Sequence, residues 1–131
     1  MDRWLARYSE RIYAVMRVVI GLLFACHGAQ KLFGALGGHS QLANPTLLAA
    51  GIIELVGGGL VALGLWASYA AVLASGEMAV AYTTVHAHQG FWPVLNQGEL
   101  AVLYCFVFLY VASRGSGPLS VDALTRKKSR A

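Results

Sequence analysis

Apolar residues fill four long stretches of this chain of 131 residues. Each stretch approaches the roughly 20 residues that a helix needs to cross the hydrocarbon core of a bilayer. The separating segments GALGGHSQLANP and QGFWPVLNQG are rich in Gly, Asn and Pro, which end helices. The pattern predicts an all-α integral membrane protein, a single domain over residues 1–131. Its predicted bundle of four transmembrane helices occupies residues 12–33, 46–66, 68–88 and 97–113.

A soluble four-helix bundle is the alternative to this interpretation. Each helix of such a bundle carries a polar stripe that faces water. The last three stretches have no such stripe. The composition, 57% hydrophobic and 12% charged, also lies far from the roughly 25% charged residues of soluble domains. We therefore favour the membrane protein.

Basic residues gather at the two ends of the chain. They are Arg3, Arg7 and Arg11 near the start, and Arg126, Lys127, Lys128 and Arg130 near the end. Because Lys and Arg favour the cytoplasmic side, and an even number of spans returns the chain to that side, both termini are predicted to be cytoplasmic. The net charge of +4 then meets anionic lipid headgroups rather than nucleic acid. Residues 119–131 are predicted to form a short amphipathic helix on the membrane surface, with Ser120 as its cap.

Charged side chains also occur inside the predicted spans. Glu54, Glu77 and Glu99 lie on the last three spans, and Arg17 and Lys31 lie on the first. An unpaired charge at the centre of a bilayer costs at least about 2.5–3.5 kcal/mol on insertion scales. These groups are therefore expected to face the inside of the bundle and to pair with one another.

Helical geometry, at about 100° per residue, places the charges of each span on one face. Arg17, His27 and Lys31 share a face of the first span. Glu77 lies in a stripe of small residues on the third span, which favours close helix packing. Glu99 shares a face, predicted to be the inward one, with three residues of the last span: Leu103, Phe106 and Tyr110.

The depth of each residue, at about 1.5 Å per residue, suggests which charges pair. We expect Arg17 to pair with Glu77, and Lys31 to pair with Glu99 or Glu54. His27 lies between these pairs, and His88 lies with His86 at the outer mouth. The candidate polar site contains Arg17, His27, Lys31, Glu54, Glu77, His88 and Glu99. Two interpretations stay open: ion pairs that only fix helix register, and an outward-opening polar pocket for a proton, an ion or a substrate.

Metal and haem sites are less well supported by the sequence. Di-iron bundles use Glu-x-x-His on two helices, and here the residues three positions after the glutamates are Gly57, Val80 and Val102. A haem between His27 and His88 requires both rings at equal depth, and His88 is placed nearer the outside. No metal site is therefore predicted. Cys26 and Cys105 lie far apart without a C-x-x-C spacing and are interpreted as packing residues.

Four segments of the chain carry a resemblance to a known family. They are RVVIGLLFACHGAQKLFG, GIIELVGGGLVALGLW, GEMAVAYTTVHAHQGFWPVLNQGELAVLY and GSGPLSVDAL. In this order they resemble the DoxX family of small bacterial membrane proteins, from about Arg17 to Leu124. The resemblance implies a four-helix, multi-pass protein of the bacterial inner membrane. The family positions it implies are present as Arg17, His27, Gly28, Lys31, Glu54, Gly58, Met78, Ala81, Gly98, Glu99, Ser120 and Asp122.

The resemblance also implies a link to redox chemistry, because the family is named for kinship with a membrane subunit of a thiosulfate:quinone oxidoreductase. One hypothesis is a quinone-linked membrane component, in which Lys31 or His27 donates a hydrogen bond to a quinone oxygen and a glutamate passes the proton. A redox partner protein would then exchange the electrons. The alternative is a non-enzymatic membrane scaffold, or a small-solute binder or permease, whose buried charges are mainly structural. Enzymatic activity stays open, and so small a bundle is compatible with a homodimer.

Overall fold

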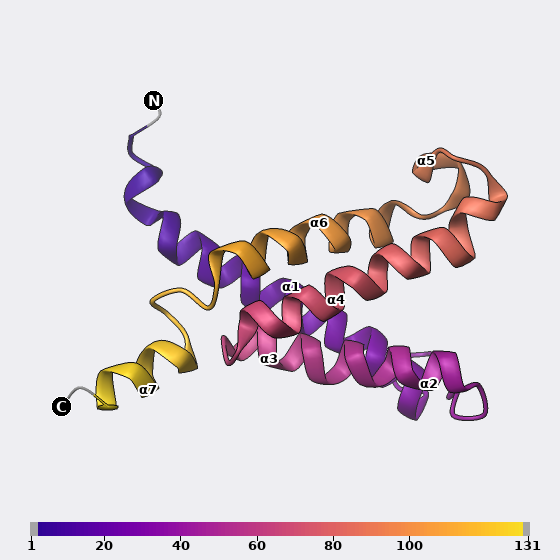
Figure 1. Ribbon diagram of the computed structural model, residues 1–131, viewed down its shortest axis with the longest axis horizontal. Coiled ribbons are helices and arrows are strands. Elements are labelled where there is room, and N and C mark those ends of the chain that lie inside the picture. The colour runs from indigo at the N-terminus through magenta and orange to yellow at the C-terminus, as the bar shows by residue number, and fades with distance from the viewer. Residues whose placement is uncertain (1–2, 130–131) are drawn as a thin grey trace.

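The computed structural model describes residues 3–129, which fold into helices without any β-strand (Figure 1). Residues 1–2 and 130–131, among them Arg130 of the predicted tail, lie outside the described residues. The elements are the 3-10 helix η1 (Ala6–Tyr8), α1 (Ser9–Phe33), α2 (Pro45–Ile52), the π-helix η2 (Ile53–Gly57), α3 (Gly58–Leu63), α4 (Ala67–Ala81), the π-helix η3 (Tyr82–His86), the 3-10 helix η4 (Ala87–Gln89), α5 (Pro93–Asn96), α6 (Glu99–Arg114) and α7 (Val121–Ser129).

Longer helical stretches lie where the sequence predicts the spans. The first is α1; α2, η2 and α3 run without a break over residues 45–63; α4, η3 and η4 run over residues 67–89; and α6 is the fourth. Two helices, Ala6–Phe33 and Pro45–Leu63, are long and apolar enough to cross a membrane. The predicted all-helical class is therefore confirmed, and helices of membrane-crossing character are present.

Short polar signals in the sequence define the first connection. α1 ends at Gly34, whose left-handed backbone (φ 65°) lets its N–H donate to the carbonyl of Gln30. α2 begins after Asn44, whose side-chain oxygen accepts from the N–H of Thr46 at 3.0 Å. Pro45 takes the first helical position, where no N–H is needed. These caps turn the chain back so that α2 packs along α1.

Glycines bring α1 into close contact with the second helical stretch. A Cβ atom built on Gly28 would lie 2.3 Å from the amide nitrogen of Leu55, and one on Gly21 would lie 2.6 Å from that of Ala62. A Cβ on Gly58 would meet the carbonyl oxygen of Gly21 at 2.5 Å. Only glycine permits this approach of the two backbones, which is the usual role of small residues between membrane helices. The crossing fixes the position of the residues that follow on both helices.

The small-residue stripe predicted on the third span packs against α6. Ala70 and Ala74 of α4 are buried, and the buried face of α6 carries Tyr104 and Phe108. The hydroxyl of Ser75 donates to a backbone carbonyl of α6 at 2.8 Å. The inward face of α4 is therefore the predicted one.

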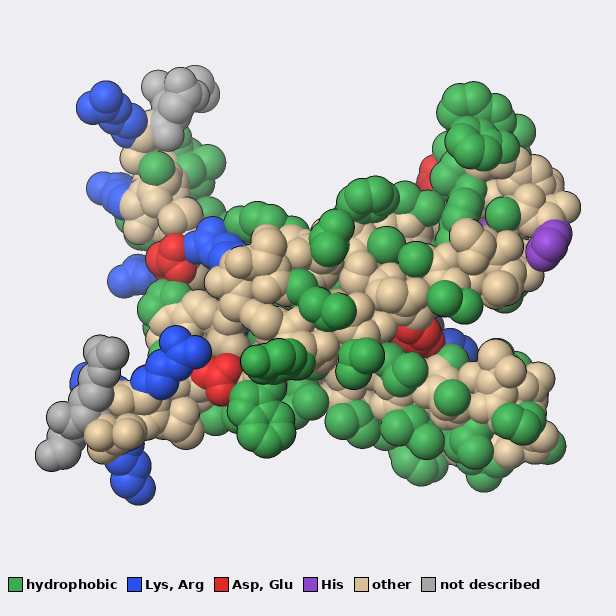
Figure 2. All heavy atoms as spheres, viewed as in Figure 1, with side chains coloured by type: hydrophobic (Ala, Val, Ile, Leu, Met, Phe, Trp, Pro, Cys, Tyr) green, Lys and Arg blue, Asp and Glu red, His purple; other side chains and the backbone are tan. Residues whose placement is uncertain are grey.

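Large apolar side chains cover much of the outside of the molecule. Leu22, Val72 and Phe106 are each more than half exposed, and Figure 2 shows hydrophobic side chains over much of the visible surface. A water-soluble bundle would place polar residues at such positions. The apolar outer surface is therefore suited to contact with the hydrocarbon chains of lipids.

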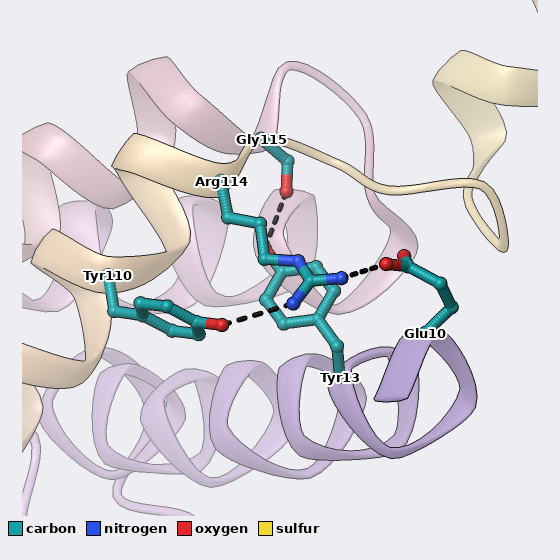
Figure 3. Close-up of polar contacts among 5 residues, drawn as sticks. All are labelled: Glu10, Tyr13, Tyr110, Arg114 and Gly115. Atoms are coloured by element: carbon teal, nitrogen blue, oxygen red, sulfur yellow. Dashed lines mark hydrogen bonds and ion pairs between the residues drawn. The ribbon is translucent and has the colours of Figure 1, made fainter. Parts of the chain in front are cut away.

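The start of α1 and the end of α6 are joined by a cluster of polar and aromatic side chains (Figure 3). Arg114 donates to the carboxylate of Glu10 and to the hydroxyl of Tyr110, and its guanidinium lies 4.4 Å from the ring centroid of Tyr13. Tyr13 in turn donates to the carbonyl of Gly115 at 2.5 Å. The cluster ties together the end of the molecule where both termini lie.

The predicted tail helix is α7, and its docking is specific. The N–H of Ala123 donates to the hydroxyl of Ser120 at 3.2 Å, which confirms Ser120 as the cap. Asp122 donates its N–H to the carbonyl of Gly64 at 3.1 Å, and its carboxylate accepts from the N–H of Trp66 at 2.9 Å. α7 is thus attached to the turn between α3 and α4.

Candidate functional site

A cleft of about 850 Å³ opens between two arms of the molecule. One wall comes from α1, α2 and η2, and the other from α4, η3 and α6. Figure 2 shows the molecule hollowed between these arms, on the side away from the chain ends, with acidic and basic side chains at the base of the hollow. Most of the wall is apolar and includes Leu47, Ile53, Leu73, Val85 and Leu100.

An ion pair between Lys31 and Glu54 lies in the cleft. Lys31 comes from the last turn of α1 and donates to Oε1 of Glu54 in η2. The Glu54 side chain is 3% exposed, whereas that of Lys31 is 29% exposed. The carboxylate is therefore buried, and the ammonium group reaches toward the opening. This pairing confirms one of the two partners that the sequence predicts for Lys31.

Two carboxylate oxygens in the cleft have no hydrogen-bond partner among the described residues. They are Oε2 of Glu54 and Oε2 of Glu77, both of them buried. Glu77 belongs to α4, so the two oxygens come from opposite walls. A buried polar atom without a partner costs about 1–3 kcal/mol, and more when it is charged. A proton, or a hydrogen-bond donor on a ligand, relieves this cost. The two oxygens are therefore the atoms of the cleft best suited to accept a hydrogen bond from a ligand.

Aromatic rings line the cleft beside these acids. The rings of His27 and Tyr104 are perpendicular, with centroids 6.1 Å apart, and Phe24 packs on Tyr104 at 5.2 Å. Phe24 and Tyr104 are nearly fully buried, while His27 is half-buried. The arrangement gives the cleft a rigid aromatic surface of the kind that holds planar groups by edge and face contacts.

Each wall of the cleft contains a π-helical segment. η2 includes Ile53 and Glu54, and η3 includes Thr84 and His86, all of which line the cleft. π-helical turns are rare and often occur at functional sites, because the additional residue in the turn redirects side chains. Glu54 therefore contacts Lys31 from a segment that departs from α geometry.

His86 lines the cleft, whereas His88, the residue chosen from the sequence, is exposed and lies outside the lining. At about 100° per residue His88 falls on the face of Glu77, and His86 falls on the opposite face. These angles assume an α-helix from Glu77 onward, but η3 (Tyr82–His86) is π-helical, so the periodicity does not hold there and His86 lines the cleft instead. Nδ1 of His86 lies 3.0 Å from the backbone carbonyl of Asn96. Since a carbonyl only accepts, Nδ1 carries the proton there.

Arg17 does not pair with Glu77, and this prediction is wrong. Arg17 lies outside the cleft, is 1% exposed, and donates to the carbonyls of Val61 and Ala62 at 2.5 and 2.8 Å, and to that of Leu119 at 2.8 Å. The last carbonyls of a helix lack a following turn to bond to. Two of those in α3 accept from the Arg17 guanidinium, that of Val61 in addition to the N–H of Gly64. The prediction compared only the depths of side chains along the helices, and a backbone carbonyl that accepts from Arg17 leaves no signal in the sequence.

Glu99 does not join the cleft or pair with Lys31, in contrast to the second prediction for Lys31. It begins α6, is exposed, and shares its face with Leu103, Phe106 and Tyr110, which are also exposed. The buried face of α6 lies instead along Tyr104 and Phe108. At a helix start a carboxylate meets the positive end of the helix dipole and can remain at the polar boundary.

Metal ligands and reactive thiols are not assembled in the part of the chain that the structure describes. No group of three or more His, Cys, Asp and Glu side chains lies close enough to hold an ion there. Cys26 is exposed on α1, and Cys105 lies on α6 with its sulfur 3.6 Å from the hydroxyl of Ser75.

Comparisons with known proteins agree with the helical membrane character. Residues 12–87 match the model of the family described as DoxX. The chain is also 40% identical, over 131 residues, to an uncharacterized protein of Haemophilus influenzae, and the match covers 95% of this chain and 98% of that protein. No solved structure matches.

Proposed function

Since the chain belongs to the DoxX family of membrane proteins, we propose that it binds a quinone headgroup in the cleft and serves as a quinone-linked component of a membrane redox reaction. The quinone tail would extend along the apolar walls. The observation that carries the proposal is the pair of buried, unpartnered carboxylate oxygens of Glu54 and Glu77 beside the Lys31 ammonium.

The polar groups of the cleft match both redox states of a quinone. A quinone has two carbonyl oxygens that accept hydrogen bonds, and Lys31 and a protonated glutamate donate them. A quinol has two hydroxyl groups, which donate to the free oxygens of Glu54 and Glu77. The apolar walls and the rings of Phe24 and Tyr104 suit the ring and the hydrocarbon chain. A small soluble anion would leave most of the apolar walls without any contact to the ligand.

Reduction of the bound quinone would consume two electrons and two protons. One proton comes from the carboxyl group of Glu77, which ionises as the first O–H bond forms. The second comes from the Lys31 ammonium, whose N–H bond breaks as the O–H bond forms at the other quinone oxygen, while Glu54 stays a carboxylate. The two electrons come from a reduced redox partner protein. His86, at the mouth of the cleft, is placed to return protons to Glu77 and Lys31 from outside.

The proposed orientation has four spans, with α4 to η4 and α6 as the third and fourth, in the bacterial inner membrane. Both termini are then cytoplasmic, because Lys and Arg side chains gather at the end where the termini lie (Figure 2). The cleft opens toward the opposite, outer side. A quinone dissolved in the bilayer would reach it laterally between the two arms.

Quinone binding by the purified protein tests the proposal. The protein is isolated in mild detergent, and ubiquinone or menaquinone binding is measured by extraction and by titration. Glu54→Gln and Lys31→Ala are expected to weaken binding, whereas Glu99→Gln, the matched acid outside the cleft, leaves it unchanged. Equal binding by all four proteins would contradict the proposal. Copurification of a soluble oxidoreductase without any effect of quinone would favour the scaffold.

The two histidines supply a second matched pair. His86→Phe is expected to slow quinone reduction by the reduced partner or by a chemical donor, because proton return to the cleft is interrupted. His88→Phe, two residues further along the chain and outside the cleft, is expected to behave as the wild type. Equal rates for the two variants would remove His86 from the proposal without affecting the binding test.

A further inference from the structure

A second cavity, of about 670 Å³, is formed by the loop after α6 and by α7, and it shares no lining residue with the cleft. Figure 1 shows α7 at the same end of the molecule as the start of α1. Three cationic side chains, Arg114, Arg126 and Lys127, line it together with one carboxylate, Asp122.

Two of these cations form no ion pair among the described residues. Arg114 is paired with Glu10, and the Asp122 carboxylate already accepts from the hydroxyl of Ser116 at 2.5 Å and from a backbone N–H. Arg126 and Lys127 are exposed, and neither forms an ion pair within residues 3–129. Within residues 3–129 the cavity therefore has an excess of positive charge, with no carboxylate paired to Arg126 or Lys127.

The cavity is held in shape by hydrogen bonds to two other parts of the chain, α1 and the turn after α3, and by a cap within its own loop. Tyr13 of α1 donates to the carbonyl of Gly115, and Arg17 donates to that of Leu119. Asp122 is bonded to the turn after α3, and Ser120 caps α7. A loop fixed in this way loses little conformational freedom when a ligand binds, which favours affinity.

The surroundings of the cavity indicate the source of the ligand. Leu119 and Leu124, on either side of the first turn of α7, are more than half exposed, and cationic residues follow in its last turn. A short helix with exposed apolar and cationic side chains lies in the headgroup region of a membrane. We propose that this cavity binds the phosphate group of an anionic phospholipid, with Arg126 and Lys127 as its cationic contacts.

Lipid binding by the full chain in detergent tests the proposal. The protein is delipidated and titrated with phosphatidylglycerol, phosphatidylcholine or inorganic phosphate, and bound species are counted by native mass spectrometry. Phosphatidylglycerol is expected to bind in preference to phosphatidylcholine. Arg126→Gln with Lys127→Gln is expected to weaken it about 25-fold, or about fivefold for each cation near the headgroups. Lys128→Gln, on the same helix but outside the lining, is expected to have little effect.

Each outcome is decisive for the site. Binding of inorganic phosphate alone, with the same dependence on Arg126 and Lys127, would support the phosphate site and overturn the lipid as its source. Equal binding of both lipids, or an equal effect of Lys128→Gln and the double variant, would overturn the proposal. Because these side chains are exposed, the variants are expected to fold, and their melting temperatures check this. The result does not depend on quinone binding in the cleft.

Discussion

Arg17 is predicted to be an anchor between helices rather than a residue of the cleft, and Arg17→Met tests this. Methionine keeps much of the apolar side-chain volume but removes three hydrogen bonds to backbone carbonyls. Hydrogen bonds that involve a charged group contribute about 1.5–3 kcal/mol each, so their sum has an upper bound of about 9 kcal/mol. The buried cation is costly, and its Nε has no partner among the described residues. We therefore expect a net loss of about 3–5 kcal/mol.

Thermal unfolding in detergent measures this loss. For a chain of this size, 1 kcal/mol corresponds to roughly 3–4 °C, so the melting temperature is expected to fall by about 10–20 °C. Arg11→Met is the control, because Arg11 is exposed on the same helix. Quinone binding by the folded Arg17→Met protein is expected to match the wild type. A melting temperature equal to that of the control, or a selective loss of quinone binding, would refute the assignment.

Two further predictions concern packing and the ion pair. Gly28→Ala is expected to disrupt the crossing of α1 and η2 and to lower the melting temperature, because its Cβ would lie 2.3 Å from a backbone nitrogen. Gly59 has open space around it, so Gly59→Ala is expected to keep or raise the melting temperature. Equal melting of the two would contradict the close crossing. Lys31→Met is expected to cost on the order of 3 kcal/mol by leaving Glu54 buried without its partner, and Lys31→Met/Glu54→Gln to recover most of this. Thermal unfolding checks both, and a double variant as unstable as the single one would show that the charges do not depend on each other.

The helices and the inward faces of the first and third spans were largely predictable from the sequence, because apolar length and small-residue spacing are local signals, whereas the inward face predicted for the fourth span was wrong. The stripe of Ala70 and Ala74 and the face of Arg17, His27 and Lys31 follow directly from helical periodicity. The cap at Ser120 was predictable for the same reason, since capping involves residues adjacent in the chain.

The membership of the cleft was only partly predictable. Lys31 and Glu54 were among the predicted partners, but choosing Glu54 over Glu99 required knowing which face of α6 packs inward, and every face of that helix is apolar. His86 was missed as a lining residue because η3 is π-helical, and the periodicity assumed an α-helix. Arg17 was misassigned because its partners are backbone carbonyls. These errors share a cause: the deciding contacts are tertiary.

A quinone headgroup bound between Lys31, Glu54 and Glu77 can be located by photolabelling. The purified protein is labelled with an azidoquinone, and the labelled peptides are identified by mass spectrometry. Labels are expected on cleft-lining residues of α1, η2, α4 and η3, removed by excess native quinone and reduced in Glu54→Gln. Labels confined to lipid-facing positions such as Phe106, insensitive to competing quinone, would contradict it.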